Sequence, residues 1–234
     1  MRLLVSPMNM EEAHAALAGG ADILDVKNPK EGSLGANFPW VIRSVADLAG
    51  GRVPVSATIG DLEFKPGTAS LAALGAASSG ADYVKAGLLG MKNYDQAEEM
   101  LKAIVRAVKD LDPAKKVVAS GYSDYSRVGS VSPMLLPAAA SKAGADVVML
   151  DTAIKDGRPT FDFMDEKHLA EFIELGHSLS LEVALAGSIG FSHLDALIRL
   201  QPDIIGVRGI VCGGDRGSAV QKDLVVKVKD ALSR

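Results

Sequence analysis

The stretch GADILDVK, residues 20–27, indicates the fold of this chain. A glycine that can end a helix precedes an aspartate, and a short apolar run then ends in a polar residue, Lys27. The Gly-Ala-Asp triplet returns at 80–82 and 144–146, and Gln-Pro-Asp stands at 201–203. An apolar run follows each time, so the repeat predicts a strand after each triplet.

Eight short apolar runs are typical of buried strands: 3–5, 23–27, 53–59, 83–86, 117–120, 147–151, 181–186 and 204–208. The segments between them show helical periodicity, most clearly at 94–109, where apolar residues form one stripe. Strict alternation of strands and helices predicts a parallel sheet. Eight units of about 29 residues each predict an α/β fold with one domain, 1–234, as a single (β/α)8 TIM barrel.

Composition excludes several classes of partner and chemistry. The net charge is −4 and no basic stripe is present, which argues against nucleic acid. The start of the chain lacks the apolar run of a secretory signal, no stretch is long enough to span a membrane, and Cys212 is the single cysteine, so we expect a cytoplasmic protein. The four histidines form no ligand set, so we expect a mechanism without a metal or other cofactor.

Charged residues end several of the predicted strands. Because the active site of such barrels lies at the carboxyl ends of the strands, these residues are candidates for catalysis. Strand period places Asp25 and Lys27 on one face, Lys85 ends the fourth strand, and Asp151 ends the sixth, with Lys155 four residues later. A lysine here can also be a side chain whose stem is buried and whose ammonium reaches water. Two such lysines at one end of the barrel favour chemistry.

Only a neutral amine attacks a carbonyl carbon. Nearby cations and an apolar site lower the pKa of a lysine toward ~7 to 8, whereas carboxylates raise it. Asp25 can therefore form an ion pair with Lys27 or transfer protons, and both remain open. The same alternatives hold for Asp151 and Lys155.

The loops after the seventh and eighth strands are rich in glycine, where barrels of this kind often bind phosphate. Ordinary turns are the alternative. We predict phosphate contacts from Gly187, Ser188, Arg208, Gly209, Gly213 and Gly214. Arg216 could also add charge, Ser218 could cap the last helix, and the long loop at 28–39 suits a cover over the site.

The chain resembles the (5-formylfuran-3-yl)methyl phosphate synthase family of methanofuran biosynthesis, essentially from end to end. The segments that carry the resemblance are LLVSP at 3–7, ADILDVKNPKEGSLGANFPW at 21–40, KPGT at 65–68, MLDTAIKDG at 149–157, ALAGSI at 184–189 and GVRG at 206–209.

The resemblance implies a metal-free lyase that condenses two molecules of glyceraldehyde 3-phosphate and releases one phosphate and water. Its Schiff-base lysine falls on Lys27 and its general acid/base lysine on Lys85. Asp25, Asp151 and Lys155 are implied as further members of the site. An imine on Lys27 can become an enamine whose carbon attacks the second aldehyde.

Two other functions remain open from the sequence. A class I aldolase of small sugar phosphates would share the fold, the lysine and the phosphate loop but would not make a furan ring. A non-catalytic barrel that binds phosphometabolites would form no covalent adduct. Exposed apolar helix faces also predict self-association into a homo-oligomer, with a triose phosphate as the small-molecule partner.

Overall fold

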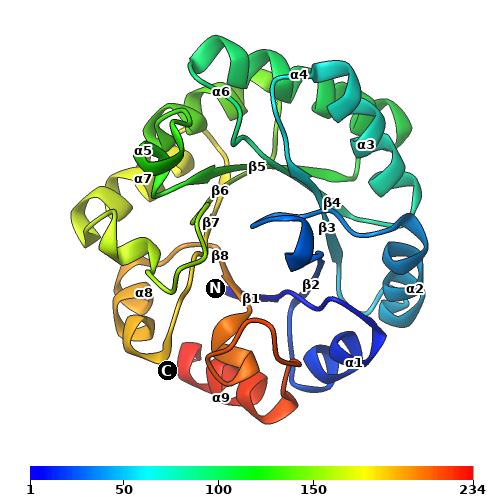
Figure 1. Cartoon of the computed structure of the whole chain (residues 1–234), viewed down its shortest axis with the longest axis vertical. Coiled ribbons are helices and arrows are strands. Elements are labelled where there is room, and N and C mark those ends of the chain that lie inside the picture. The colour runs from blue at the N-terminus through cyan, green and yellow to red at the C-terminus, as the bar shows by residue number, and fades with distance from the viewer. Residues whose placement is uncertain (234) are drawn as a thin grey trace.

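The computed structural model describes residues 1–233, and they form the closed barrel that the sequence predicts. Eight parallel strands pair in chain order, and β1 closes the ring on β8. Figure 1 shows the strands as a ring surrounded by helices. The strands are β1 (Arg2–Val5), β2 (Ile23–Val26), β3 (Val55–Asp61), β4 (Tyr83–Gly87), β5 (Lys116–Tyr122), β6 (Val147–Asp151), β7 (Glu182–Leu185) and β8 (Ile204–Val207).

The connections between strands run through helices on the outside of the ring. The α-helices are α1 (Met10–Ala18), α2 (Pro39–Ala49), α3 (Pro66–Ser78), α4 (Tyr94–Leu111), α5 (Tyr125–Val128), α6 (Leu136–Ala143), α7 (Glu166–Ser178), α8 (Leu194–Leu200) and α9 (Lys222–Leu232). Short 3-10 helices are η1 (Pro29–Glu31), η2 (Pro133–Leu135), η3 (Thr160–Asp162), η4 (Phe191–His193) and η5 (Gly209–Cys212). In α4, the Asn93 side chain accepts from the Gln96 N–H, and the predicted apolar stripe faces the core.

The repeated aspartates tie each even-numbered strand to the strand before it. Asp22, Asp82, Asp146 and Asp203 accept the N–H groups of Leu3, Val55, Val117 and Val183 at 2.7–2.8 Å. Their own N–H groups donate back to the carbonyls of those residues at 2.7–3.0 Å. The glycine two positions earlier has positive φ in all three Gly-Ala-Asp copies. The triplet therefore ends a helix and sets the start of a strand pair.

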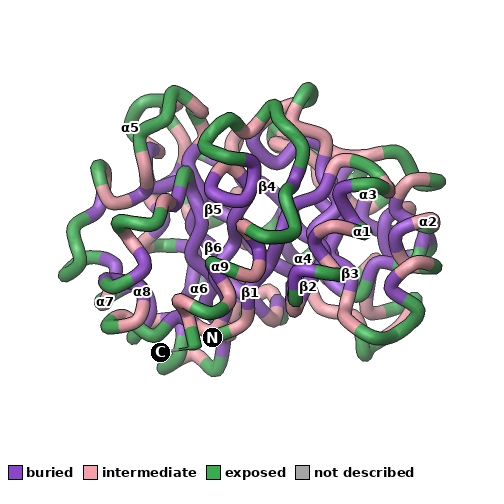
Figure 2. Tube along the Cα trace, turned by 90° about the horizontal axis from the view of Figure 1, so that it is seen from below, coloured by how far each residue is buried: buried purple, intermediate pink, exposed green. Residues whose placement is uncertain are grey.

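Two apolar clusters hold the barrel together. The larger lies between strands and helices, and the smaller consists of strand residues on the alternate face, inside the ring: Leu4, Ile23, Tyr83, Val118, Val147, Met149, Ala184, Ala186 and Ile204. Figure 2 shows the buried strands in the middle of the molecule and the exposed residues toward its outside. The polar residues at the carboxyl ends of the strands lie above the smaller cluster, so their floor is apolar.

The largest differences from the predicted boundaries, of two residues, are in β3 and β5, and the start of the last helix also differs. β3 begins at Val55 because Pro54 has no N–H for the ladder, and it continues to Asp61 through an irregular register after Thr58. β5 continues to Tyr122, two residues past its expected end. The expected cap of the last helix is wrong: Gln221 precedes α9, while the Ser218 hydroxyl donates to Asp215.

Candidate active site

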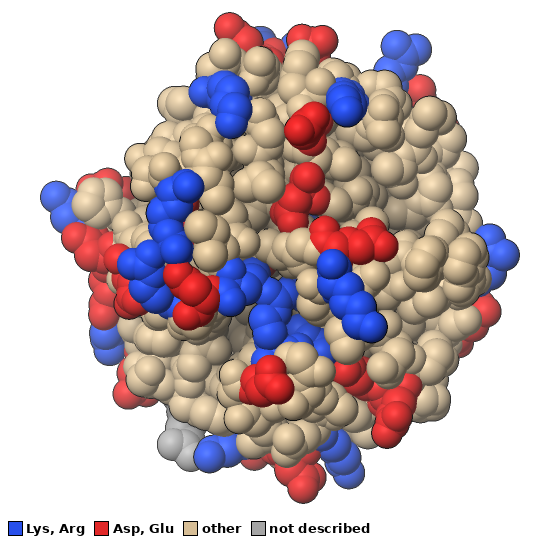
Figure 3. Space-filling model, in the orientation of Figure 1, with Lys and Arg blue, Asp and Glu red and all other residues tan. Residues whose placement is uncertain are grey.

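A cavity of about 600 Å³ opens at the carboxyl ends of the strands. Every site residue proposed from the sequence lines it: Asp25, Lys27, Lys85, Asp151, Lys155, Gly187, Ser188, Arg208, Gly209, Gly213 and Gly214. Figure 3 shows a central hollow on this face of the barrel, with Lys and Arg side chains gathered in it. The structure thus brings together residues that span most of the sequence.

Asp25 and Lys85 form a buried ion pair at the bottom of this cavity. The Lys85 Nζ lies 2.7 Å from Asp25 Oδ2, and both side chains are buried. Ser6 and Ser56 hydroxyls donate to the same carboxylate at 3.0 and 2.7 Å. Burial acts to raise the pKa of Asp25, but the lysine charges, that of Lys85 first, outweigh it and lower that pKa. The partner of Asp25 is therefore Lys85 and not Lys27, which corrects the ion pair considered from the sequence.

Lys27, directly after β2, is the site lysine without a bonded acceptor. Among residues 1–233 its Nζ takes part in no hydrogen bond or salt bridge of the structure, although the residue is only 7% exposed. Burial lowers the pKa of Lys27 to about 8, with Asp151 opposing and Lys85 adding to the decrease. At pH 7 about one Lys27 in ten is then neutral, against about one in 3,000 for an ordinary lysine. Lys27 is thus the amine best suited to attack a carbonyl.

We expect the reactivity of Lys27 to rise with pH up to about 8 and to level off above it. Only the neutral amine reacts, so each pH unit below this value should reduce the rate about tenfold. Competitive acetylation, followed by mass spectrometry of each lysine between about pH 6 and pH 11, measures the midpoint. Lys167, exposed on α7, is the internal reference. A Lys27 midpoint equal to that of Lys167 would contradict the expectation.

Asp151 and Lys155 form the second carboxylate–amine pair. Lys155 Nζ contacts Asp151 Oδ1 and lies 3.0 Å from Thr152 Oγ1. Burial acts to raise the pKa of Asp151, and the charges of Lys155 and then Lys27 outweigh it and lower that pKa. This carboxylate remains ionised near neutral pH and lies close enough to Lys27 to act on its charge. The pairing considered from the sequence for these two residues is confirmed in the structure.

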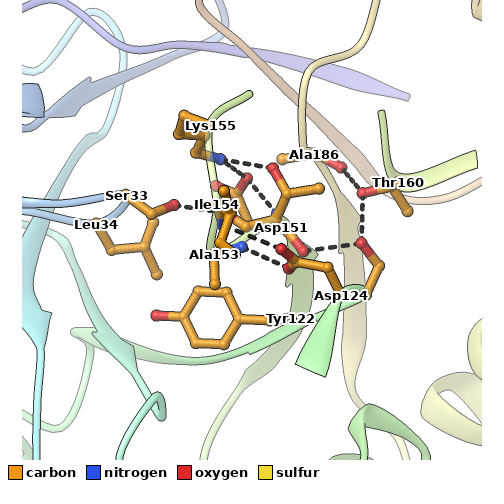
Figure 4. Close-up of polar contacts among 12 residues, drawn as sticks. Ser33, Leu34, Tyr122, Asp124, Asp151, Ala153, Ile154, Lys155, Thr160 and Ala186 are labelled. Atoms are coloured by element: carbon orange, nitrogen blue, oxygen red, sulfur yellow. Dashed lines mark hydrogen bonds and ion pairs between the residues drawn. The ribbon is translucent and has the colours of Figure 1, made fainter. Parts of the chain in front are cut away.

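Asp124, which sequence reasoning missed, fixes the loop that carries Lys155. It follows β5 and is fully buried, and its two carboxylate oxygens accept the N–H groups of Ala153 and Ile154 at 2.6 and 3.0 Å. Figure 4 shows this carboxylate beneath the turn from which Lys155 extends toward Asp151. Asp124 stands two residues after β5, whereas Asp151 is the last residue of β6, so attention to acidic residues just after the strands could have identified Asp124.

Asp124→Asn is expected to lower kcat about tenfold, because an amide can accept only one of the two N–H groups well and the Lys155 turn loosens. Hydrogen exchange of residues 152–156 should become faster, while imine formation at Lys27 continues. Asp110→Asn, at an exposed position of α4, is the matched control. Unchanged exchange together with unchanged kcat would show that Asp124 does not position Lys155.

The loop at 28–39 is anchored across the strand ends. Ser33 Oγ donates to the carbonyl of Thr152 at 2.7 Å, and the Leu34 N–H donates to Asp61 Oδ2 at 3.0 Å. The Tyr122 hydroxyl donates to the other Asp61 oxygen. Figure 1 shows this segment inside the ring of strands, and a role as a cover over the site stays a prediction. Sequence reasoning missed Asp61 and Tyr122 because it ended both strands two residues early.

The glycine-rich loops after β7 and β8 form one wall of the cavity. Gly187 has φ +94°, and a Cβ there would collide with the Thr160 hydroxyl. Ser188 also has positive φ, 51°, so the chain turns sharply away from β7. Arg208 holds this region together: its guanidinium pairs with Glu12 at 2.7 Å and donates to the carbonyls of Ser6, Arg216 and Ser218. Arg208 thus lines the cavity and also holds this loop in place, and the phosphate contact predicted for it from the sequence stays a prediction.

Residues 1–233 contain neither a metal-binding cluster nor a membrane-spanning helix. No cluster of three or more histidine, cysteine, aspartate or glutamate side chains in this range is arranged to hold a metal ion. Cys212 is buried, and burial raises the pKa of its thiol to about 11, which keeps it protonated. No helix in the same range is both long and apolar enough to cross a membrane.

Comparison with protein families matches residues 3–229 to the model of 4-HFC-P synthase. The chain belongs to this family. Its relatives include proteins named (5-formylfuran-3-yl)methyl phosphate synthase from three organisms. The Methanosarcina mazei protein is 64% identical over 97% of both chains, and the Archaeoglobus fulgidus protein is 59% identical over 99% of both. The Methanocaldococcus jannaschii protein is 57% identical over 98% of this chain and 99% of its own. These names confirm the resemblance and indicate an enzyme.

Solved structures share the fold at low sequence identity. KGPDC from Streptococcus mutans has a TM-score of 0.67 at 15% identity, covering 100% of this chain and 97% of its own. The 3-hexulose-6-phosphate synthase of Salmonella typhimurium has a TM-score of 0.68 at 17% identity, covering 100% and 99%. At these identities the likeness concerns the barrel alone.

Proposed function

We propose that this enzyme condenses two molecules of glyceraldehyde 3-phosphate into (5-formylfuran-3-yl)methyl phosphate, with loss of one phosphate and water, in methanofuran biosynthesis. The family match and the names of the relatives support this product. The proposal rests on the state of Lys27. This amine is buried, has a lowered pKa and no bonded acceptor, and lies in a cavity lined by two further lysines. The cavity volume lies within the roughly 300–1,000 Å³ of small-molecule sites.

Lys27 is proposed to form an imine with the aldehyde of one triose phosphate, and no metal or other cofactor is invoked. The imine acidifies the hydrogen on the adjacent carbon, and removal of that proton gives an enamine. An enamine next to a phosphate ester can expel phosphate or form a carbon–carbon bond. The Asp25–Lys85 and Asp151–Lys155 pairs are placed to move protons during these steps, since each joins an ammonium to a carboxylate at the cavity wall.

Incubation of the purified enzyme with glyceraldehyde 3-phosphate tests the proposal. We expect an ultraviolet absorbance typical of a furan aldehyde and one inorganic phosphate released per furan. A carbon–carbon adduct without phosphate release would instead identify a Schiff-base aldolase. Binding without any product or borohydride-trapped adduct would identify a barrel that only binds phosphometabolites.

A further inference from the structure

The cations of the cavity differ in whether a carboxylate neutralises them. Lys85 pairs with Asp25, Lys155 with Asp151, and Arg208 with Glu12. Lys27 and Arg216 take part in no salt bridge among residues 1–233. Lys27 has a chemical reason to lack a partner, because its amine must be free to react. Arg216 has no such reason, since its guanidinium stays protonated and is not a nucleophile.

Arg216 lines the cavity from the loop between β8 and α9. Its Nη2 atom is buried and has no hydrogen-bond partner, although the residue as a whole is only partly buried. Burial lowers the pKa of this guanidinium, Asp151 and Asp61 oppose the decrease, and Arg208 adds to it. The charges of Asp151 and Asp61, at the ends of β6 and β3, therefore reach Arg216 across the mouth of the barrel. A buried N–H without an acceptor is unfavourable, and an anion in the cavity would supply the acceptor.

The loop around Arg216 is built to hold this position. Arg208 Nε donates to the Arg216 carbonyl at 2.7 Å, so the buried Arg208–Glu12 pair fixes the backbone from which the Arg216 side chain extends. Asp215 accepts the Gly217 N–H and the Ser218 hydroxyl, both at 2.9 Å, and closes the turn. Both arginines line the cavity, but the Arg208 guanidinium is engaged by Glu12 and by loop carbonyls, whereas Arg216 Nη2 has no partner within residues 1–233.

We propose that Arg216 binds the phosphate group of the second triose phosphate, opposite the imine-forming molecule on Lys27. This inference rests on the proposed function for the identity of the substrate. A phosphate monoester carries close to two negative charges near neutral pH, and the planar guanidinium fork of arginine matches its oxygens. The glycine-rich loop after β7 then remains for the phosphate of the first molecule. The two phosphates of the proposed reaction would in this way have separate anchors.

The test replaces Arg216 with Gln, which removes the charge and keeps some hydrogen bonding, and with Lys, which keeps the charge and loses the fork. Arg43→Gln is the matched control, because Arg43 is exposed on α2 and forms no hydrogen bond or salt bridge within residues 1–233. We expect Arg216→Gln to raise KM for glyceraldehyde 3-phosphate about 10- to 100-fold. Arg216→Lys should recover part of this loss, and Arg43→Gln should equal the wild type. Borohydride should still label Lys27 in all three variants at saturating substrate, with unchanged melting temperatures.

Calorimetric titration with inorganic phosphate separates this inference from the proposed function, because it needs no turnover. Weaker phosphate binding by Arg216→Gln than by wild type, together with the raised KM, supports the assignment. Unchanged KM overturns it, and if phosphate affinity nevertheless falls, Arg216 serves the released phosphate instead of the substrate. If wild type binds phosphate through Arg216 but makes no furan, the proposed function fails while the anion site stands.

Discussion

Lys27→Ala is expected to lower the rate of furan formation by at least about 1,000-fold and to abolish borohydride trapping of substrate on the enzyme. The other two site lysines each form an ion pair with a carboxylate, so neither can replace the lost amine without breaking its ion pair. Peptide mass spectrometry of the trapped wild type should place the added mass on Lys27. Lys167→Ala on the surface of α7 should trap and turn over as the wild type does.

The same variant is expected to fold at least as stably as the wild type near pH 7. Lys27 has a pKa of about 8 in the folded protein, lower than that of a lysine in the unfolded chain. It therefore destabilises the fold at every pH at which the unfolded chain keeps this lysine protonated. This penalty is full below the folded pKa and vanishes above the ordinary value near 10.5. At pH 7 it is on the order of 3 kcal/mol, offset in part by the packing lost with the side chain. A Lys27→Ala variant that traps substrate, or that loses activity only because it unfolds, would contradict the role proposed for Lys27.

The fold and the membership of the site were predictable because both depend on local signals. A short apolar run after a Gly-Ala-Asp triplet marks a strand, and the strands of a parallel barrel present their carboxyl ends on one face. Any polar residue at such an end, such as Lys85 or Asp151, must therefore lie near the others. No knowledge of the register was needed to place them in one cavity.

The partners within the site were not predictable, because pairing depends on register and on loop paths. Lys85 lies level with Thr58 of β3, and Asp25 lies level with Ser56, so the lysine reaches across one strand to the carboxylate. Sequence proximity suggested Lys27 as the partner of Asp25. For the same reason, the sequence did not show that Arg208 is paired and Arg216 is not, since Glu12, the partner of Arg208, lies at the other end of the chain.

Lys85→Met is expected to lower turnover about 100- to 10,000-fold while imine formation at Lys27 continues. Lys85 is proposed to exchange protons with the bound intermediates together with Asp25, and a thioether cannot. The loss of its charge, and the freeing of Asp25 from its partner, should both raise the pKa of Lys27, because Lys85 lowers that pKa and Asp25 raises it. Substrate trapping near neutral pH should thus become slower, and its pH midpoint should move above 8.

Stability separates this chemical role from a structural one. Lys85→Met leaves the Asp25 carboxylate buried without a cation, which is expected to cost about 3–5 kcal/mol of unfolding free energy. The double variant Asp25→Asn/Lys85→Met removes both charges and should recover much of this stability, but no turnover. Lys116→Met, which removes one of the two cations paired with Glu182 at the opposite end of the barrel, is the matched control and should leave turnover intact. If the double variant regains activity along with stability, Lys85 serves only to neutralise Asp25.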